Sequence, residues 1–324
     1  MKTIKIGLLG LGNIGTGTYK TLEMNRSEIE STLNAKVEIV KILERDTERD
    51  RGITVPKEKF TSDPDEIFQD PEIDIVIELL GGIEPATTFM LSALKNGKHV
   101  VTANKAALAA NYHELINTAK ENNVILRFEA SVGGGIPILG TLTGPLRANK
   151  FEEVMGILNG TTNYILTMMT KEGLDYETAL KDAQEQGFAE ADPTADVEGI
   201  DAANKLTILI ALMFDKYVAP KDIPTTGITE ITKEKIEEAR SNGCKIKLIA
   251  HAWRDENDEI KYEVRPMYIS ATHPLANINK EFNAVFVKGN AVDDVMFYGK
   301  GAGPLPTGSA VLGDVIDISM MILK

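Results

Sequence analysis

The chain has 324 residues, which is long for a single typical core and predicts about two domains. Hydrophobic residues make up 43% and charged residues 26%, as in ordinary globular proteins, and the net charge of −13 disfavours nucleic acids and anionic membrane surfaces as partners. The one cysteine, Cys244, excludes an intrachain disulfide and, with four scattered histidines, forms no metal-ligand cluster. The N-terminus shows no signal-peptide pattern and no run of about eighteen apolar residues occurs, so a cytoplasmic protein is expected.

Short apolar runs alternate with longer helical patterns over the first 130 residues. The apolar runs predict strands, at residues 3–10, 36–43, 74–80, 99–103 and 124–131. The segments between them predict helices, at residues 15–33, 64–71, 85–96 and 105–123. Because these strands are apolar along nearly their whole length and alternate with helices, they indicate an α/β fold, a Rossmann-type doubly wound parallel sheet covered on both faces.

A glycine cluster, GLGNIG, spans Gly10 to Gly15 and matches the pattern G-x-G-x-x-G. It follows the first strand and opens the first helix, which is the context that the motif requires. Gly10 permits the tight turn, Gly12 lets the backbone approach a pyrophosphate, and Gly15 lets the helix pack closely on the strand. Since the helix N-terminus also supplies N–H donors and positive potential, the pattern predicts a dinucleotide-binding site rather than a plain turn.

The residues after the second strand bear on which dinucleotide binds. A carboxylate there would hold the ribose 2′-hydroxyl of NAD, whereas an arginine would accept the 2′-phosphate of NADP. Glu44 and Arg45 are adjacent at this point, so both cofactors stay open. Arg49 and Arg51 complete a small arginine cluster, and because a phosphate requires cations the sequence favours NADP.

Lys105 lies directly after the strand at 99–103, at the carboxyl edge where open α/β sheets bind ligands. A solvated helix N-terminus is the alternative interpretation. However, a cation at a helix start opposes the macrodipole and is poorly placed for stability, so a functional lysine is favoured.

The pattern changes after about residue 130, where a glycine-rich connection begins. Further strands are expected at residues 151–160, 244–255, 259–269 and 283–289, and a last helix at 313–324. These elements predict an α+β domain with a mixed or antiparallel sheet. The expected division is therefore 1–130, completed by 300–324, and 131–299.

An acidic stretch, residues 187–206, carries five carboxylates and no base before Lys205. The residues around Lys205 predict a helix that is apolar nearly all round, so this lysine should be buried and should need a partner. Asp201, one helical turn earlier, is the expected partner. Spacing alone leaves a structural ion pair and a catalytic lysine equally open.

Five longer motifs carry a family resemblance: VVTANKAAL, FEASVGGGIPI, GILNGTTNYIL, GFAEADPTADVEGIDAANKL and GAGPLPTGSAVLGDV. With the glycine cluster they occur in the order seen in homoserine dehydrogenases, and the resemblance covers essentially the whole chain. It is to the short kind, without a C-terminal regulatory domain, from which little inhibition by threonine is expected. The resemblance implies reversible reduction of L-aspartate 4-semialdehyde to L-homoserine with NADPH or NADH, a step in threonine, methionine and isoleucine biosynthesis.

The resemblance also assigns roles to residues. It makes Lys205 the proton donor to the aldehyde oxygen, with Asp201 orienting it, and Lys105 a cation that holds cofactor and substrate together. Substrate contacts are expected from the carboxylates of Glu190 and Asp196 and the N–H groups of Gly160 and Thr161. Cofactor contacts are expected from Gly10, Gly12, Asn13, Ile14, Gly15, Arg45, Leu80, Gly81, Thr102, Asn104, Lys105 and Gly301. Backbone carbonyls of a sodium or potassium loop are expected at Glu129, Val132, Gly134 and Ile136.

The resemblance further implies a homodimer formed through the second domain, which would then serve substrate binding, catalysis and dimerisation. Two other functions remain as alternatives. An acylating semialdehyde dehydrogenase would require Cys244 as its nucleophile. A non-catalytic NADP-binding sensor would not require a lysine on a core helix beside a series of acids.

Overall fold

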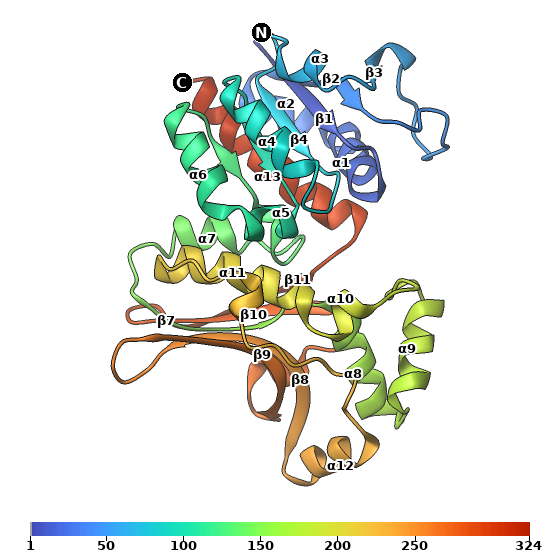
Figure 1. Ribbon diagram of the computed structural model, residues 1–324, viewed down its shortest axis with the longest axis vertical. Helices are drawn as coiled ribbons and strands as arrows, with labels where there is room; N and C mark the ends of the chain where they lie inside the picture. Colours follow the sequence, from blue (N-terminus) through green and yellow to red (C-terminus); the bar gives the residue numbers. More distant parts are fainter. Residues whose placement is uncertain (1) are drawn as a thin grey trace. The chain divides into compact units, whose positions relative to one another are not determined.

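The structure, a computed structural model, describes residues 2–324 (Figure 1). The chain folds into two compact units. The first contains the residues up to Gly135 together with Ala302–Lys324, and the second is Ile136–Gly301. The last helix of the chain therefore belongs to the same unit as the first strand.

The first unit contains a parallel six-stranded sheet in the order β3-β2-β1-β4-β5-β6. Its strands are β1 (Thr3–Leu9), β2 (Lys36–Leu43), β3 (Phe60–Thr61), β4 (Ile75–Glu78), β5 (His99–Thr102) and β6 (Leu126–Arg127). This confirms the predicted Rossmann-type sheet. The strand order reverses between β1 and β4, and ligands of such sheets bind beyond the carboxyl ends of the strands at this reversal.

Helices of the first unit are α1 (Asn13–Met24), α2 (Arg26–Leu33), α3 (Asp65–Phe68), α4 (Ala86–Lys95), α5 (Lys105–Ala110), α6 (Tyr112–Glu121) and α13 (Pro304–Ile322), with short 3₁₀ turns η1 (Lys57–Lys59) and η2 (Glu129–Ser131). Two predicted helices, 15–33 and 105–123, are each broken in two. The breaks lie at Asn25 and Asn111, both with non-helical backbone angles. Asparagine side chains compete for backbone hydrogen bonds, which favours such interruptions.

The last helix, α13, begins well before the predicted residue 313. Pro304 stands in its first turn, where the fixed backbone angle of proline suits a helix start. Within this helix, position 308 requires a glycine, because a Cβ there would lie 2.8 Å from the backbone nitrogen of Thr18 on α1. Among the described residues, α13 is the one helix long and apolar enough to cross a membrane by length and composition. Its apolar residues Val311, Leu312, Val315 and Ile318 join the core that contains β1, and this packing accounts for its composition.

The second unit contains an antiparallel five-stranded sheet in the order β11-β10-β7-β8-β9. Of the two arrangements expected, mixed or antiparallel, the structure has the antiparallel one. The strands are β7 (Phe151–Ile157), β8 (Cys244–Arg254), β9 (Ile260–Ser270), β10 (Phe282–Gly289) and β11 (Asp293–Lys300). Strand β11 is not among the predicted strands. Its apolar residues run consecutively from Val295 to Tyr298, so the sequence there lacks the alternation of a half-buried strand.

Helices of the second unit are α7 (Leu139–Thr143), α8 (Gly160–Glu172), α9 (Tyr176–Glu185), α10 (Thr194–Val197), α11 (Ile200–Phe214) and α12 (Lys233–Ser241), with 3₁₀ turns η3 (Pro220–Asp222) and η4 (Pro274–Asn277). Helices α8 and α11 both contact β8 (Figure 1). Helix α11 is buried along nearly its whole length, as its all-round apolar sequence predicts.

Candidate active site

The glycine cluster turns from β1 into α1. Gly10 adopts a φ of 93°, which favours glycine, and a Cβ at Gly15 would overlap the carbonyl oxygen of Gly10. Gly12 is the N-cap of α1, and a Cβ there would meet no described heavy atom within 4 Å outside its chain neighbours. Gly10 thus makes the turn, Gly15 allows the close approach of helix and strand, and Gly12 borders open space. These are the three roles that glycines have in a pyrophosphate-binding loop.

The loops after β4 and β5 are joined by buried polar groups. The hydroxyl of Thr102 donates to Glu78 Oε2 at 2.6 Å and accepts the N–H of Asn104 at 2.9 Å. The side-chain amide of Asn104 donates to the carbonyl of Gly82 at 2.7 Å, while its oxygen accepts the N–H of Ala107 at 3.0 Å and so caps α5. These bonds fix the backbone that carries Lys105, the first residue of α5.

Glu78 is a buried polar residue that sequence reasoning missed. It is the last residue of β4, at the reversal of strand order, and is fully buried. Burial raises the pKa of its carboxyl group, against hydrogen bonds from Thr102 and Leu80 that lower it. The sequence does contain a signal for this residue, since a carboxylate within an otherwise apolar strand needs buried hydrogen-bond partners.

The other expected cofactor residues lie on different segments. Leu80 and Gly81 follow β4, and Leu80 is exposed. Arg45 is exposed beyond the end of β2. Gly301 is the last residue of the second unit, and a Cβ there would overlap the side chain of Asn283.

In the second unit, helix α11 carries a buried ion pair. Lys205 Nζ lies 2.6 Å from Asp201 Oδ2 and donates a second hydrogen bond, also 2.6 Å, to the carbonyl of Leu158. Both side chains are about nine-tenths buried. The i, i+4 partner predicted from spacing is thus present. Two acceptors use two of the three N–H donors of the ammonium, which leaves the third for a ligand.

Asn159 connects this pair to the acidic stretch. Its amide nitrogen lies 2.9 Å from Asp201 Oδ2 and 2.6 Å from Asp196 Oδ1, and Asp196 Oδ2 lies 3.0 Å from the Thr161 hydroxyl. Lys205, Asp201, Asn159, Asp196 and Thr161 therefore form one hydrogen-bonded cluster. The sequence prediction missed Asn159, although an asparagine between a strand and a helix is a frequent N-cap.

The start of α8 lies beside this cluster. Asn159 caps the helix by accepting the N–H of Thr162 at 2.9 Å. Gly160 is the first helical residue, and a Cβ there would lie 2.8 Å from the carbonyl oxygen of Glu281. A side chain is therefore excluded at the point where the helix N-terminus offers its N–H groups.

Glu190 lies apart from the cluster. Its side chain is exposed, and its one described hydrogen bond is made by its backbone carbonyl, which accepts from Gln184. The structure therefore brings Asp196 and Thr161 to Lys205 but leaves the carboxylate of Glu190 outside these hydrogen bonds.

The expected cation loop is a backbone feature. Gly133 and Gly134 both adopt positive φ angles, 74° and 55°, which turn the chain sharply after η2. The backbone N–H of Glu129 donates to Asp314 Oδ2 at 2.8 Å, which holds the start of the loop on α13. Carbonyl oxygens are suitable ligands for a monovalent cation, and no carboxylate or histidine cluster among the described residues offers a site of another kind.

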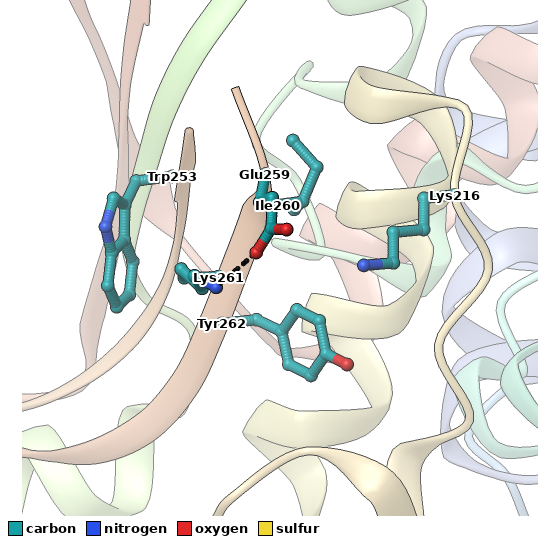
Figure 2. Close-up of a pocket in the computed structure, with 6 residues that line it drawn as sticks. All are labelled: Lys216, Trp253, Glu259, Ile260, Lys261 and Tyr262. Carbon is teal, nitrogen blue, oxygen red and sulfur yellow. Dashed lines mark hydrogen bonds and ion pairs between the residues drawn. The ribbon is translucent and has the colours of Figure 1, made fainter. Parts of the chain in front are cut away.

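A hollow of about 870 Å³ opens at the turn between β8 and β9 (Figure 2). It is lined by Lys216, Trp253, Glu259, Ile260, Lys261 and Tyr262. Lys261 donates to Glu259 at 2.7 Å, and Lys216 Nζ lies 5.4 Å from the centre of the Tyr262 ring. None of the expected site residues lines this hollow, so it is separate from the candidate active site.

Known proteins match the chain over both units. The family model of the homoserine dehydrogenase NAD binding domain matches residues 10–129, and that of homoserine dehydrogenase matches residues 137–316. A homoserine dehydrogenase of Bacillus subtilis is 45% identical over 318 residues, which cover 98% of this chain and 73% of that protein.

Solved structures agree with these matches. The crystal structure of a homoserine dehydrogenase from Thiobacillus denitrificans has a TM-score of 0.96 at 43% identity and covers 99% of this chain and 74% of that one. A hyperthermophilic archaeal homoserine dehydrogenase in complex with NADPH has a TM-score of 0.82 at 25% identity and covers 98% of both chains. The chain belongs to the homoserine dehydrogenase family of NAD(P)-dependent oxidoreductases that act in amino-acid biosynthesis.

Proposed function

We propose that the protein reduces L-aspartate 4-semialdehyde reversibly to L-homoserine, with NADPH as its preferred cofactor, NADH as the alternative, and Lys205 as proton donor. The observation that carries this proposal is the buried Lys205–Asp201 pair and its connection through Asn159 to Asp196. The family match supports the reaction, and the cluster supports the assignment of residues.

The nicotinamide cofactor, when bound, supplies the hydride. As a hydride adds to the aldehyde carbon, negative charge develops on the aldehyde oxygen. The Lys205 ammonium stabilises this charge and donates its proton to that oxygen. Asp201 and the carbonyl of Leu158 orient the ammonium by holding two of its three N–H groups.

The substrate also carries an ammonium and a carboxylate, and the acidic stretch and the start of α8 suit these two groups. Asp196 binds the substrate ammonium together with Glu190, whose exposed carboxylate moves inward for this contact. The N–H groups of Gly160 and Thr161 bind the substrate carboxylate at the helix N-terminus. In the first unit, Lys105 lies directly beyond β5 and helps to hold cofactor and substrate.

Three further properties belong to this proposal. The carbonyls of Glu129, Val132, Gly134 and Ile136 hold a sodium or potassium ion, in keeping with the tight turn at Gly133 and Gly134. Two chains form a dimer through the second unit, where Tyr268, Met296 and Tyr298 expose large apolar surfaces. The protein works in the cytoplasm, where its single free cysteine remains reduced.

Serine in place of Cys244 should leave the activity unchanged, within about twofold, because a hydride transfer to an aldehyde needs no thiol nucleophile. Wild type and Cys244→Ser are compared by NADPH oxidation with L-aspartate 4-semialdehyde, and L-homoserine is identified as the product. Inactivity of Cys244→Ser would favour the acylating dehydrogenase. Tight NADPH binding without turnover in either protein would favour the sensor.

A further inference from the structure

We propose that an ion pair between Glu44 and Arg51 selects NADP over NAD, by withdrawing the carboxylate at the end of β2 from the ribose of the cofactor. This inference rests on the dinucleotide site of the proposed function. The pair lies in the segment between β2 and η1, and the segment folds back onto the glycine loop.

The carboxylate of Glu44 has its acceptor positions filled from within the chain. Oε2 accepts the N–H of Leu11 at 3.0 Å and lies 3.3 Å from Nη2 of Arg51. Oε1 accepts the N–H groups of Arg45 and Asp46 at 2.9 and 3.1 Å. A carboxylate offers about four acceptor positions, so a ribose hydroxyl could bind Glu44 only by displacing one of the three backbone N–H groups or the Arg51 guanidinium.

Arg51 is held as firmly as its partner. Its side chain is only 7% exposed. Nε donates to the carbonyl of Leu11 at 2.7 Å, and Nη2 and Nη1 donate to the carbonyls of Asp46 and Arg49 at 2.7 and 2.9 Å. Glu44 and Arg51 therefore hold both the N–H and the carbonyl of Leu11, the residue between the first two glycines of the cluster.

The carboxylate stays ionised at neutral pH. Burial opposes ionisation, but hydrogen bonds from the backbone of Asp46, Leu11 and Arg45, together with the charge of Arg51, lower the pKa of Glu44 below its usual value. The Arg51 guanidinium offsets this charge, so a 2′-phosphate near the end of β2 meets a neutralised pair.

The remaining acids of the segment have local partners as well. Asp46 accepts the N–H of Arg49, Asp50 accepts the N–H of Gly52, and Glu48 pairs with Lys57 at 3.3 Å. The side chains of Arg45 and Arg49 are exposed at the surface of this segment. They are the cations available to a 2′-phosphate, while the acceptor that NAD would need is engaged.

The test is the ratio of the dissociation constants of NADPH and NADH, measured by fluorescence with the full chain. Arg51→Met frees one acceptor position of Glu44 and leaves its charge without a counter-ion, while the three backbone hydrogen bonds stay. NADPH should therefore bind more weakly and NADH more tightly, and the preference for NADPH should fall about tenfold or more. Glu44→Gln combined with Arg51→Met also removes the negative charge of Glu44 and should restore the preference for NADPH. Arg45→Met should weaken the binding of NADPH alone. Arg26→Met, which removes a guanidinium bound to Glu23 of α1 and to Glu30 of its own helix α2, should leave the ratio unchanged.

Two results would overturn the proposal. One is an equal loss of affinity for NADPH and NADH in Arg51→Met, which would mean that the pair only holds the glycine loop. The other is a double variant with the same preference as Arg51→Met alone. Because binding is measured without turnover, an enzyme that binds NADPH but does not reduce the semialdehyde would contradict the proposed reaction and still test this inference.

Discussion

Asp201→Ala is expected to lower the free energy of unfolding by about 3–5 kcal/mol and to reduce kcat strongly, because it leaves the Lys205 ammonium buried without its carboxylate. Both side chains are about nine-tenths buried, so the ammonium loses its charged partner at a place where bulk water solvates it poorly. The loss should appear in urea unfolding and in steady-state kinetics. Asp201→Asn, which keeps an acceptor oxygen but no charge, should fall between wild type and Asp201→Ala.

Asp192→Ala is the matched control for Asp201→Ala. Asp192 belongs to the same acidic stretch, but it is exposed, and within residues 2–324 its side chain accepts from Thr194 alone, in a turn. Its loss should cost less than about 1 kcal/mol and leave kcat unchanged. If Asp201→Ala were as stable and as active as Asp192→Ala, Asp201 would not be the partner on which Lys205 depends.

Lys247 leads to the second large prediction, a stability that rises with pH. Lys247 lies on β8, is only 3% exposed, and donates to Asn163 Oδ1 at 2.8 Å and to the carbonyl of Ile278. No described carboxylate pairs with it. Burial, with smaller contributions from the charges of Lys245 and Lys171, lowers the pKa of Lys247 to about 7.

The sign of the effect follows from proton binding. In the unfolded chain a lysine keeps a pKa of about 10.4, so between about pH 7 and pH 10 the unfolded state binds more protons than the folded state. The free energy of unfolding therefore rises with pH across this range, and the full cost of the buried charge is present below about pH 7. Relative to Lys247→Met, which cannot titrate, the wild type should gain roughly 2–5 kcal/mol from pH 6 to pH 10.

Urea unfolding of both proteins at pH 6, 8 and 10 measures this gain, because other titrating groups cancel in the difference. Lys233→Met, at an exposed position on α12, is the control, and its difference from wild type should vary by less than about 0.5 kcal/mol. A difference between wild type and Lys247→Met that stays constant with pH would contradict the account of Lys247 as a lysine that loses its proton near neutral pH.

The burial of Lys247 could not be predicted from the sequence. Lys245 and Lys247 are two residues apart on β8, so alternation places both on one face of the sheet. Only Lys247 is covered, by Asn163 of α8 and the chain at Ile278, which are 84 and 31 residues away in sequence. Which residues cover a side chain depends on tertiary packing, and the periodicity of the sequence gives no information about it.

The parallel sheet and the Lys205–Asp201 pair could be predicted because each depends on short spacings. Continuous apolar runs indicate buried strands, and an interval of four residues places two side chains on one face of a helix. Asn159 joins acids that lie 37 and 42 residues away, so its role became visible only in the folded chain. For the same reason the sequence could not separate Asp196, which reaches this cluster, from Glu190, which is exposed outside it.

The assignment of Lys205 as proton donor is tested most directly by NADPH oxidation with L-aspartate 4-semialdehyde, measured for wild type, Lys205→Ala and Lys205→Arg. Lys205→Arg keeps a cation beside Asp201 but replaces the ammonium with a guanidinium that does not give up its proton near neutral pH. Both variants should lose about 10²- to 10⁴-fold in kcat while their dissociation constants for NADPH stay within about twofold of wild type. A kcat near that of the wild type in either variant would contradict the assignment.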